Sequence, residues 1–372
     1  MMEMDRIIQG NCLEILPQMP DESIDCCITS PPYWGLRDYK TEPQVWGGRV
    51  DCEHEWIKQP PRRKRHPEDI KNHESKQATE KASSPELPYT DSCVRCNAWR
   101  GSLGLEPTPE LYVKHLVEVF REVKRVLRSD GTLWLNLGDS YASSTNGGSK
   151  VQGNPEFNIN RPSRELTVLP PRDMPDGLKP KDLVGIPWSV AFALRADGWV
   201  LRSEIIWHKP NPMPESVRDR PTKSHEQVFL FAKSQKYYYD ADAIRENKNE
   251  RGFRKGSNVE FRAGKEELRN DKLEFIKDKE WFGRNKRSVW TISTKPFHDA
   301  HFATFPPELV EPMVKAGCPE RGVVLDPFFG SGTVGLVAKK QCRHFIGIDL
   351  NPDYCRMAEK RLEPYLNQKV LA

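Results

Sequence analysis

Short apolar runs alternate along the chain with longer segments in which apolar residues recur every three or four positions. IDCCIT at 24–29, TLWLNL at 132–137 and VVLD at 323–326 have the length and composition of buried strands. Residues 107–127 separate the first two runs and carry apolar side chains at helical spacing, and a Ser-Asp-Gly turn at 129–131 is expected to end this helix. Strands that alternate with helices predict an α/β fold with a mostly parallel sheet covered on both faces.

The same alternation continues towards the C-terminus. We expect a helix over 182–196, strands over 200–207, 227–232 and 345–349, and helices over 330–340 and 352–366. Residues 57–90 and 141–180 are rich in Pro, Ser, Asn and Lys and are expected to form mobile loops.

Composition places this fold in a large cytoplasmic protein. The chain has 372 residues, 37% of them hydrophobic, enough for one large α/β core with insertions or for two modest domains. No apolar run approaches the roughly 20 residues that span a bilayer, and residues 1–9 lack the layout of a signal peptide. We therefore expect no membrane partner, and nine cysteines that are mostly reduced.

Basic charge is concentrated in two segments, although the net charge is only +4. Residues 57–66 carry five Lys or Arg and no acid, and residues 245–287 carry fourteen against nine Asp or Glu. Such segments favour a polyanionic partner, because Lys and Arg that replace condensed counterions dominate nucleic-acid affinity. The alternative for either segment alone is a solvated surface.

A glycine-rich turn indicates a nucleotide-type pocket. VVLDPFFGSGTVGLVA at 323–338 places Gly-Ser-Gly between a strand and a helix, whose free N–H groups face a ligand. The segment lacks the Gly-Lys-Ser/Thr end of an ATP-binding loop and the spacing of a dinucleotide fingerprint. Asp349 ends the next strand, where it could accept both hydroxyls of a ribose. The alternative is a tight turn followed by a helix cap.

A rigid proline segment follows the strand at 24–29. Ser30, Pro31 and Pro32 form an extended shelf, because proline fixes its own φ and keeps the preceding residue extended. Tyr33 and Trp34 then offer flat faces for a planar ring. The shelf suits a nucleobase whose exocyclic amino group donates to the Ser30 side chain and the Pro31 carbonyl while Tyr33 stacks on the ring.

Two cysteine-containing stretches predict a zinc-binding insertion. DCEHEW at 51–56 and SCVRCNAW at 92–99 bracket a basic segment, and two thiolates two residues apart can converge on one tetrahedral ion. The alternative is free thiols in an ordered loop. The candidate zinc ligands are Cys52, His54, Cys93 and Cys96, with His66 and His73 as competing histidines.

TSPPYW followed far downstream by DPFFGSGT resembles the S-adenosylmethionine-dependent DNA amino-methyltransferases, specifically their permuted (beta) group. Further matches follow in the order of that group: IIQGNCLEIL, TLWLNLGDSY, EIIWHKPNPMP, HFATFPPELVEPM and GIDLNPDYC. The resemblance covers most of the chain. It implies a Rossmann-like, seven-stranded sheet that is mostly parallel with one antiparallel strand.

The resemblance also implies a reaction and its residues. A methyl group would move from S-adenosylmethionine directly to the amino group of a flipped base in double-stranded DNA, without a covalent intermediate. Ser30 is most like the enzymes that modify N4 of cytosine, and N6 of adenine stays open. Asp139 would border the active site. The catalytic residues would be Ser30, Pro31, Pro32 and Tyr33, and the cofactor-binding residues Asn11, Phe305, Pro306, Asp326, Phe328, Gly330, Ser331, Gly332, Thr333, Asp349 and Asn351.

On this basis the chain divides into a methyltransferase core and insertions. The expected parts are a catalytic half at 1–46 and 97–140, a zinc-binding basic insertion at 47–96, a mobile loop at 141–180, core strands and a helix at 181–244, a charged insertion for target recognition at 245–290 and a cofactor-binding half at 291–372. Alternatives are methylation of RNA or of a protein glutamine, and a non-catalytic DNA-binding module with a relic pocket. The sequence, of prokaryotic or phage type, leaves open a cognate restriction enzyme and whether the protein is a monomer or a homodimer.

Overall fold

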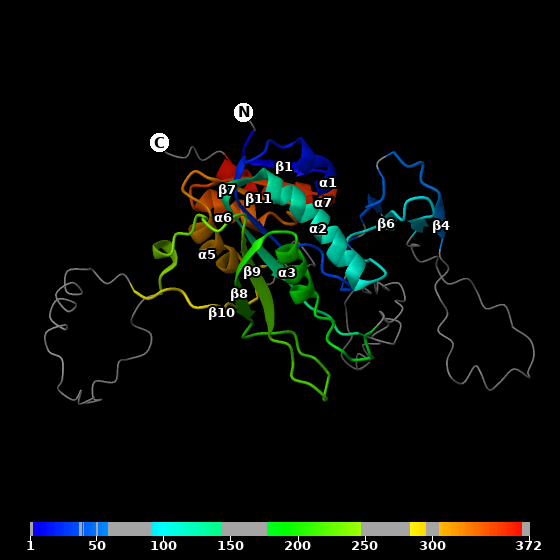
Figure 1. Ribbon diagram of the computed structural model, residues 1–372. Helices are drawn as coiled ribbons and strands as arrows, with labels where there is room; N and C mark the ends of the chain where they lie inside the picture. The colour runs from blue at the N-terminus through cyan, green and yellow to red at the C-terminus, as the bar shows by residue number, and fades with distance from the viewer. Residues whose placement is uncertain are drawn as a thin grey trace, which may run out of the picture.

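The computed structural model describes residues 3–36, 39, 41–49, 51–58, 91–142, 177–246, 283–294 and 305–366. These residues form an eight-stranded sheet between helices and a separate four-stranded antiparallel sheet, which Figure 1 shows beside the main one. No helix among them is both long and apolar enough to cross a bilayer.

The main sheet is parallel except for one strand, β9, which runs against both of its neighbours. This agrees with the expected mostly parallel sheet, but among the described residues the main sheet has eight strands and not seven. The additional strand, β10, has only three residues at the edge of the sheet, too few to give a hydrophobic pattern. In spatial order the strands are β1 (Arg6–Gln9), β12 (His344–Asp349), β11 (Val323–Asp326), β2 (Ile24–Thr29), β7 (Leu127–Leu137), β9 (His225–Ala232), β8 (Val200–His208) and β10 (Val289–Thr291).

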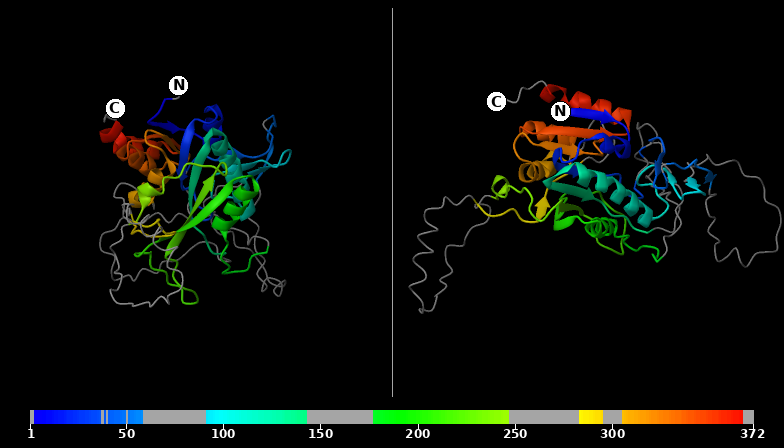
Figure 2. Two further views of the ribbon diagram at one scale, coloured as in Figure 1. Left: turned by 60° about the vertical axis from the view of Figure 1, so that its left-hand side comes forward. Right: turned by 45° about the horizontal axis from the view of Figure 1, so that its top comes forward.

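Helices cover both faces of this sheet, and each face has its own apolar core. α2 and α3 pack on one face, and α5, α6 and α7 on the other. β1 and α7 lie side by side in Figures 1 and 2. The helices are α1 (Cys12–Ile15), α2 (Pro109–Val126), α3 (Ile186–Ala196), α5 (Pro307–Gly317), α6 (Thr333–Lys340) and α7 (Pro352–Leu366), with 3₁₀ turns at Leu16–Gln18 and Asp242–Ile244.

α2 connects directly to β7. The helix begins after Thr108, whose Oγ1 accepts the N–H of Leu111 at 3.2 Å. It ends at Val126, and β7 starts at the next residue, so the turn expected at 129–131 is part of the strand. Residues 128–130 are exposed there, and the pairing of β7 with β2 shifts register at this point. A bulge in the strand therefore takes the place of the predicted turn.

The small sheet, which we call the ribbon, includes residues on both sides of the insertion expected at 47–96. Its strands, in spatial order, are β3 (Gln44–Trp46), β6 (Trp99–Gly101), β5 (Asp91–Cys93) and β4 (Trp56–Lys58). Figure 1 shows α2 running from the main sheet towards the ribbon, and the views in Figure 2 agree.

Candidate functional site

The two segments with the strongest sequence signals begin beside each other. β2 and β11 are adjacent parallel strands, with Cys26 opposite Val324. At their carboxyl ends the Thr29 hydroxyl donates to Asp326 Oδ1 at 2.7 Å. The shelf at 30–33 leaves β2 at this point, and the glycine loop at 330–332 follows β11. In parallel α/β sheets ligands bind at this edge.

The shelf and the turn after it are hydrogen-bonded to α2 and to the segment that precedes α2. The Tyr112 hydroxyl donates to the Pro32 carbonyl at 2.8 Å. The N–H of Gly35 donates to the Gly104 carbonyl at 2.9 Å. Pro31 is buried, whereas Pro32 and its neighbours Ser30 and Tyr33 are half-buried. The shelf is thus fixed on its inner side and accessible on its outer side.

The Tyr33 hydroxyl lies at the centre of a polar network. It donates to Glu226 Oε2 at 2.8 Å and accepts the Asn136 side-chain N–H at 2.5 Å and the Ser30 hydroxyl at 3.2 Å. Burial, and next the charge of Glu226, raise the pKa of Tyr33 well above its ordinary value, so the hydroxyl stays protonated. The ring packs on Gly138, where a Cβ atom would lie 2.5 Å from a ring carbon. Asn136 and Glu226 were not predicted.

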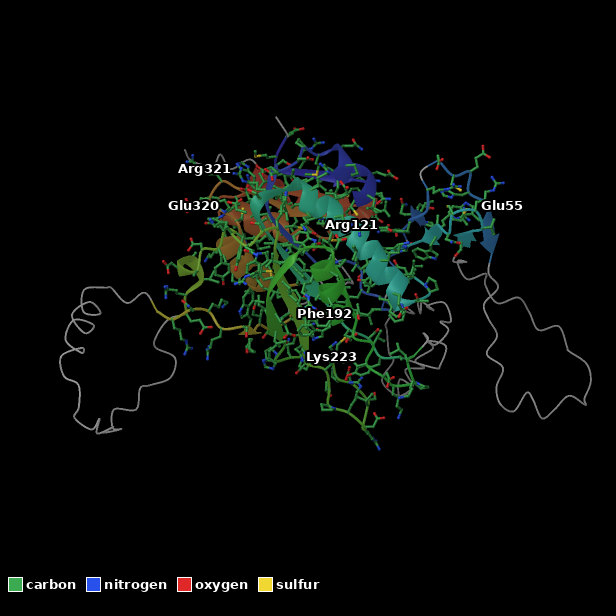
Figure 3. The ribbon with its side chains drawn as sticks, viewed as in Figure 1. Glu55, Arg121, Phe192, Lys223, Glu320 and Arg321 are labelled. Carbon is green, nitrogen blue, oxygen red and sulfur yellow. The ribbon has the colours of Figure 1, made fainter. Side chains whose placement is uncertain are left out.

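Two lysines lie around Glu226. Lys209 forms an ion pair with its carboxylate, and the Lys209 ammonium lies 4.3 Å from the centroid of the Trp207 ring. The Lys223 ammonium donates to the Asp139 carbonyl at 3.4 Å, and burial lowers its pKa. Figure 3 places Lys223 at the opposite end of the molecule from Arg321, which precedes β11. Lys223 therefore marks the end of the molecule at which the parallel strands finish.

Asp139, expected to border the active site, has a structural role. Its carboxylate accepts the backbone N–H groups of Gly185 and Ile186 at 3.0 and 3.1 Å. Gly185 precedes α3 and offers no side chain to cap it. Asp139 therefore caps α3 from the end of a neighbouring strand and fixes the backbone beside Lys223.

Trp34 does not offer a flat face to a ligand, and that expectation is wrong. The side chain is only 5% exposed, and its indole N–H donates to the Glu106 carbonyl at 3.0 Å. The chain reverses at Gly35, which has a φ of +80° and thereby directs Trp34 into the core. Of these two adjacent aromatic residues, Tyr33 is therefore the one that offers a ring at the shelf.

The glycine loop has the backbone geometry that a close ligand requires. Gly330 and Gly332 have φ values of +52° and +77°, which residues with a Cβ atom rarely adopt. Asp349 holds the loop, since its carboxylate accepts the N–H of Gly330 at 2.7 Å and that of Asn351 at 2.8 Å. Burial raises the pKa of Asp349, and these two hydrogen bonds oppose the shift. Each carboxylate oxygen retains a second acceptor position for a ribose hydroxyl.

Arg361 of α7 forms hydrogen bonds with the glycine loop, a contact that the sequence did not predict. Its guanidinium donates to the hydroxyls of Ser331 and Thr333 at 3.2 and 2.9 Å, and to the Ser331 carbonyl at 3.0 Å. Both hydroxyls are buried. Ser331 and Thr333 thus direct their side chains towards α7, and their backbone is the part that can face a ligand.

The other predicted cofactor residues lie at the same edge or in the adjoining core. Asn11 follows β1, where its Oδ1 accepts the Leu13 N–H at 3.0 Å and its Nδ2 donates to Gln44 Oε1 at 3.1 Å. The adjacent Gly10 donates its N–H to the Asp349 carbonyl, so Asn11 lies beside the ribose candidate. Phe328 is half-buried, Phe305 packs on the core of α5 and α6, and Pro306 is the buried N-cap of α5.

Asp326 is a buried acid between the two halves of the site. Its Oδ1 accepts the Thr29 hydroxyl at 2.7 Å and the Phe328 N–H at 3.0 Å. Burial raises the pKa of Asp326 to about 7; the two hydrogen bonds oppose the shift, and the charge of Asp349 adds to it. The side chain therefore changes charge near neutral pH.

Asp326→Asn is expected to remove a pH dependence of stability. The folded carboxyl has a pKa of about 7, against about 4 in the unfolded chain, so its stabilising contribution is present below pH 4 and is lost as the pH rises through 7. From pH 5 to 8 the melting temperature of the native protein should fall relative to the variant by a few degrees. Differential scanning calorimetry measures this, with Asp353→Asn, at an exposed position of α7, as control. A difference in melting temperature between the native protein and Asp326→Asn that stays constant with pH would contradict the pKa assigned to Asp326.

The four predicted zinc ligands lie together. Their ligand atoms are all within 4.8 Å of one another, with Cys52 Sγ 3.9 Å from Cys93 Sγ and Cys96 Sγ 3.4 Å from His54 Nδ1. Tetrahedral zinc would place two sulfurs about 3.8 Å apart and a sulfur and a nitrogen about 3.6 Å apart. Burial raises the pKa of the Cys93 thiol, but hydrogen bonds from His54 and backbone N–H groups outweigh it and lower the pKa to about 6. His66 and His73 lie outside the described residues.

Comparisons with known proteins agree with this geometry. The family model for DNA methylases of the N6/N4 type matches residues 24–360. The Type II methyltransferase M.Cfr9I of Citrobacter freundii is 40% identical over 357 residues, which cover 96% of this chain and 87% of the relative. M.SmaI of Serratia marcescens is 38% identical and covers 96% and 90%. The solved PvuII DNA methyltransferase (cytosine-N4-specific) shares the fold, with a TM-score of 0.54 at 16% identity over 96% of this chain and 86% of that one.

Proposed function

Because the chain belongs to the family of S-adenosylmethionine-dependent DNA amino-methyltransferases, we propose that it methylates N4 of a specific cytosine in double-stranded DNA. The observation that carries the proposal is the shelf at 30–33, which leaves β2 beside the glycine loop that follows β11. One half of the site suits a planar base with an amino group, and the other suits a nucleoside cofactor. Ser30 at the first shelf position supports cytosine, and N6 of adenine is the alternative.

The shelf activates the amino group by holding its hydrogens. The nitrogen lone pair of an exocyclic amine is delocalised into the ring and is a poor nucleophile. Acceptors at the Ser30 hydroxyl and the Pro31 carbonyl draw the N–H groups out of the ring plane, so that the nitrogen becomes more tetrahedral. When S-adenosylmethionine is bound, the amine would attack its methyl carbon in line, so that the new N–C bond forms as the C–S bond breaks and the neutral thioether S-adenosylhomocysteine leaves. Catalysis rests on positioning and on acceptors already in place.

The network behind the shelf can remove the proton that methyl transfer makes acidic. The Ser30 hydroxyl donates to the Tyr33 hydroxyl, which donates to the Glu226 carboxylate. A proton taken from the methylated nitrogen by Ser30 can pass through Tyr33 to Glu226, which becomes neutral. None of the nine cysteines is needed, because no covalent bond to a ring carbon forms.

A duplex substrate requires that the base leave the stack, at a cost of a few kcal/mol that contacts to the strand offset. We assign target recognition to the segment 141–180 or the segment 245–290, both largely outside the described residues, together with the zinc-binding insertion. We propose that the protein acts in the cytoplasm of a bacterium, like the Type II methyltransferases to which it is similar, and that it protects host DNA from a cognate restriction enzyme.

The product identifies the target base. Purified protein incubated with tritiated S-adenosylmethionine and unmethylated duplex DNA should transfer label to DNA, and nucleoside digestion should place it in N4-methylcytosine. Label in N6-methyladenine would support the proposed reaction but identify adenine, and not cytosine, as the target base. Absence of label in DNA, with the cofactor shown to bind, would favour the non-catalytic alternative.

We also propose that Cys52, His54, Cys93 and Cys96 hold a structural zinc ion. Four protein ligands leave no open position for catalysis. The purified protein should contain about one zinc per chain by elemental analysis, and Cys93→Ser should lose it, whereas Cys342→Ser, at an exposed cysteine, should keep it. Equal zinc in both variants would contradict the site.

A further inference from the structure

The ribbon contacts the main domain through two tryptophans that enclose one histidine. Trp46 of β3 and Trp99 of β6 stack on His115 of α2, with ring centroids 5.1 and 5.4 Å away and interplanar angles of 27° and 20°. All three side chains are buried. The Trp46 indole N–H also donates to the Gly101 carbonyl at 2.9 Å. A movement of the ribbon therefore moves the His115 ring.

His115 is joined to the segment that supports the shelf. Its Nδ1 lies 3.0 Å from Glu106 Oε1, and neither side chain is exposed by more than 1%. The second carboxylate oxygen of Glu106 accepts the Gly104 N–H at 2.8 Å. The backbone carbonyl of Glu106 accepts the Trp34 indole N–H at 3.0 Å. Glu106 thus connects His115 of α2 to two residues: Trp34, in the turn that follows the shelf, and Gly104, in the segment that precedes α2.

Gly104 completes the connection. Its carbonyl accepts the Gly35 N–H at 2.9 Å, and a Cβ atom at Gly104 would lie 3.0 Å from the Tyr33 carbonyl oxygen. The ribbon also reaches the cofactor half, since Gln44 of β3 accepts the Asn11 amide at 3.1 Å. The ribbon therefore contacts both halves of the site, although its metal-ligand group belongs to neither.

We propose that the ribbon positions the shelf for methyl transfer. A metal ion bound to the ribbon fixes the ribbon's structure, and His115 and Glu106 connect the ribbon to the shelf. This inference rests on the proposed methyl transfer at that shelf. An ion at the Cys52, His54, Cys93 and Cys96 group holds the β3–β4 loop against the β5–β6 turn, and so fixes Trp46 and Trp99. The rate of methyl transfer depends on the relative position of the reacting groups, because a misplacement of about 1 Å can cost about 100-fold in rate.

The first test compares two histidines that pair with carboxylates. His115→Gln breaks the proposed connection, whereas His344→Gln removes the Nδ1 contact of 2.9 Å to Asp5 at the amino end of β12. In the full-length, zinc-loaded protein, His115→Gln should lower kcat by about 100-fold with unchanged zinc content and little change in the KM for S-adenosylmethionine. His344→Gln should retain the native kcat. Glu106→Gln serves as the second variant and should behave like His115→Gln.

Metal removal distinguishes positioning from general destabilisation. Chelation should lower the kcat of the native protein and should lower that of His115→Gln little further, because the connection is already broken. Amide hydrogen exchange at Gly35 and Gly104 should become faster in both cases. Native kcat in zinc-loaded His115→Gln, native kcat after chelation, or additive losses would overturn the proposal. If the zinc-loaded native protein methylates no DNA, the proposed function fails, and the exchange at Gly35 and Gly104 still tests the connection.

Discussion

Tyr33→Ala is expected to lower the rate of methyl transfer by at least about 100-fold, because stacking on a base contributes about 1–3 kcal/mol and the variant also breaks the network to Glu226. The affinity for S-adenosylmethionine should stay within about twofold, since the cofactor loop follows a different strand. Single-turnover transfer measures the first quantity and isothermal titration calorimetry the second.

Tyr33→Phe is the matched control, because it keeps the ring on Gly138 and removes only the hydroxyl that joins Ser30 to Glu226. It should lose less activity than the alanine variant if stacking dominates, and about as much if the proton route through the hydroxyl dominates. An equal loss of cofactor affinity and transfer in Tyr33→Ala would show that Tyr33 does not hold the base.

Asp349→Ala should weaken S-adenosylmethionine binding by about 100-fold or more. The carboxylate fixes the loop through the N–H groups of Gly330 and Asn351, and a hydrogen bond to a charged group contributes about 1.5–3 kcal/mol. The variant loses both bonds together with the expected acceptor of the ribose. Calorimetric titration of the cofactor gives the change in Kd.

Asp353→Ala provides the control for Asp349→Ala, because Asp353 lies four residues further on, is 71% exposed and pairs only with Arg356 among the described ion pairs. It should bind the cofactor like the native protein. If Asp349→Ala also bound it normally, the glycine loop would not be the cofactor site.

Local pattern was enough to predict the elements that carry the site. The strands at 24–29 and 323–326 and the helix at 352–366 were predicted with the bounds that the structure gives them. Buried parallel strands are continuous apolar runs with clear ends, and prolines or glycines follow both of these strands. Spacing also predicted the Cys93 and Cys96 half-site, but the one-residue spacing of Cys52 and His54 is atypical, and the fold is what brings these two residues to the pair.

Residues that complete the site from other strands could not be predicted. Asn136 and Glu226 lie 90 positions apart and meet only because the antiparallel β9 pairs with β7. Arg361 is one of three basic residues on its helix, and only the fold shows that it contacts the glycine loop. Trp34 was misjudged because sequence does not tell which of two adjacent aromatics points inward after a turn. Each of these depends on long-range packing and leaves no local pattern.

The most direct test of the shelf and the glycine loop as the two halves of one methyl-transfer site is a crystal structure of the protein with S-adenosylmethionine and a duplex that contains its target site. We expect the donor to lie on the loop at 330–332, with its methyl carbon facing an extruded base whose amino group contacts Ser30 and whose ring lies on Tyr33. A donor bound far from residues 30–33, or a base held elsewhere, would contradict this expectation.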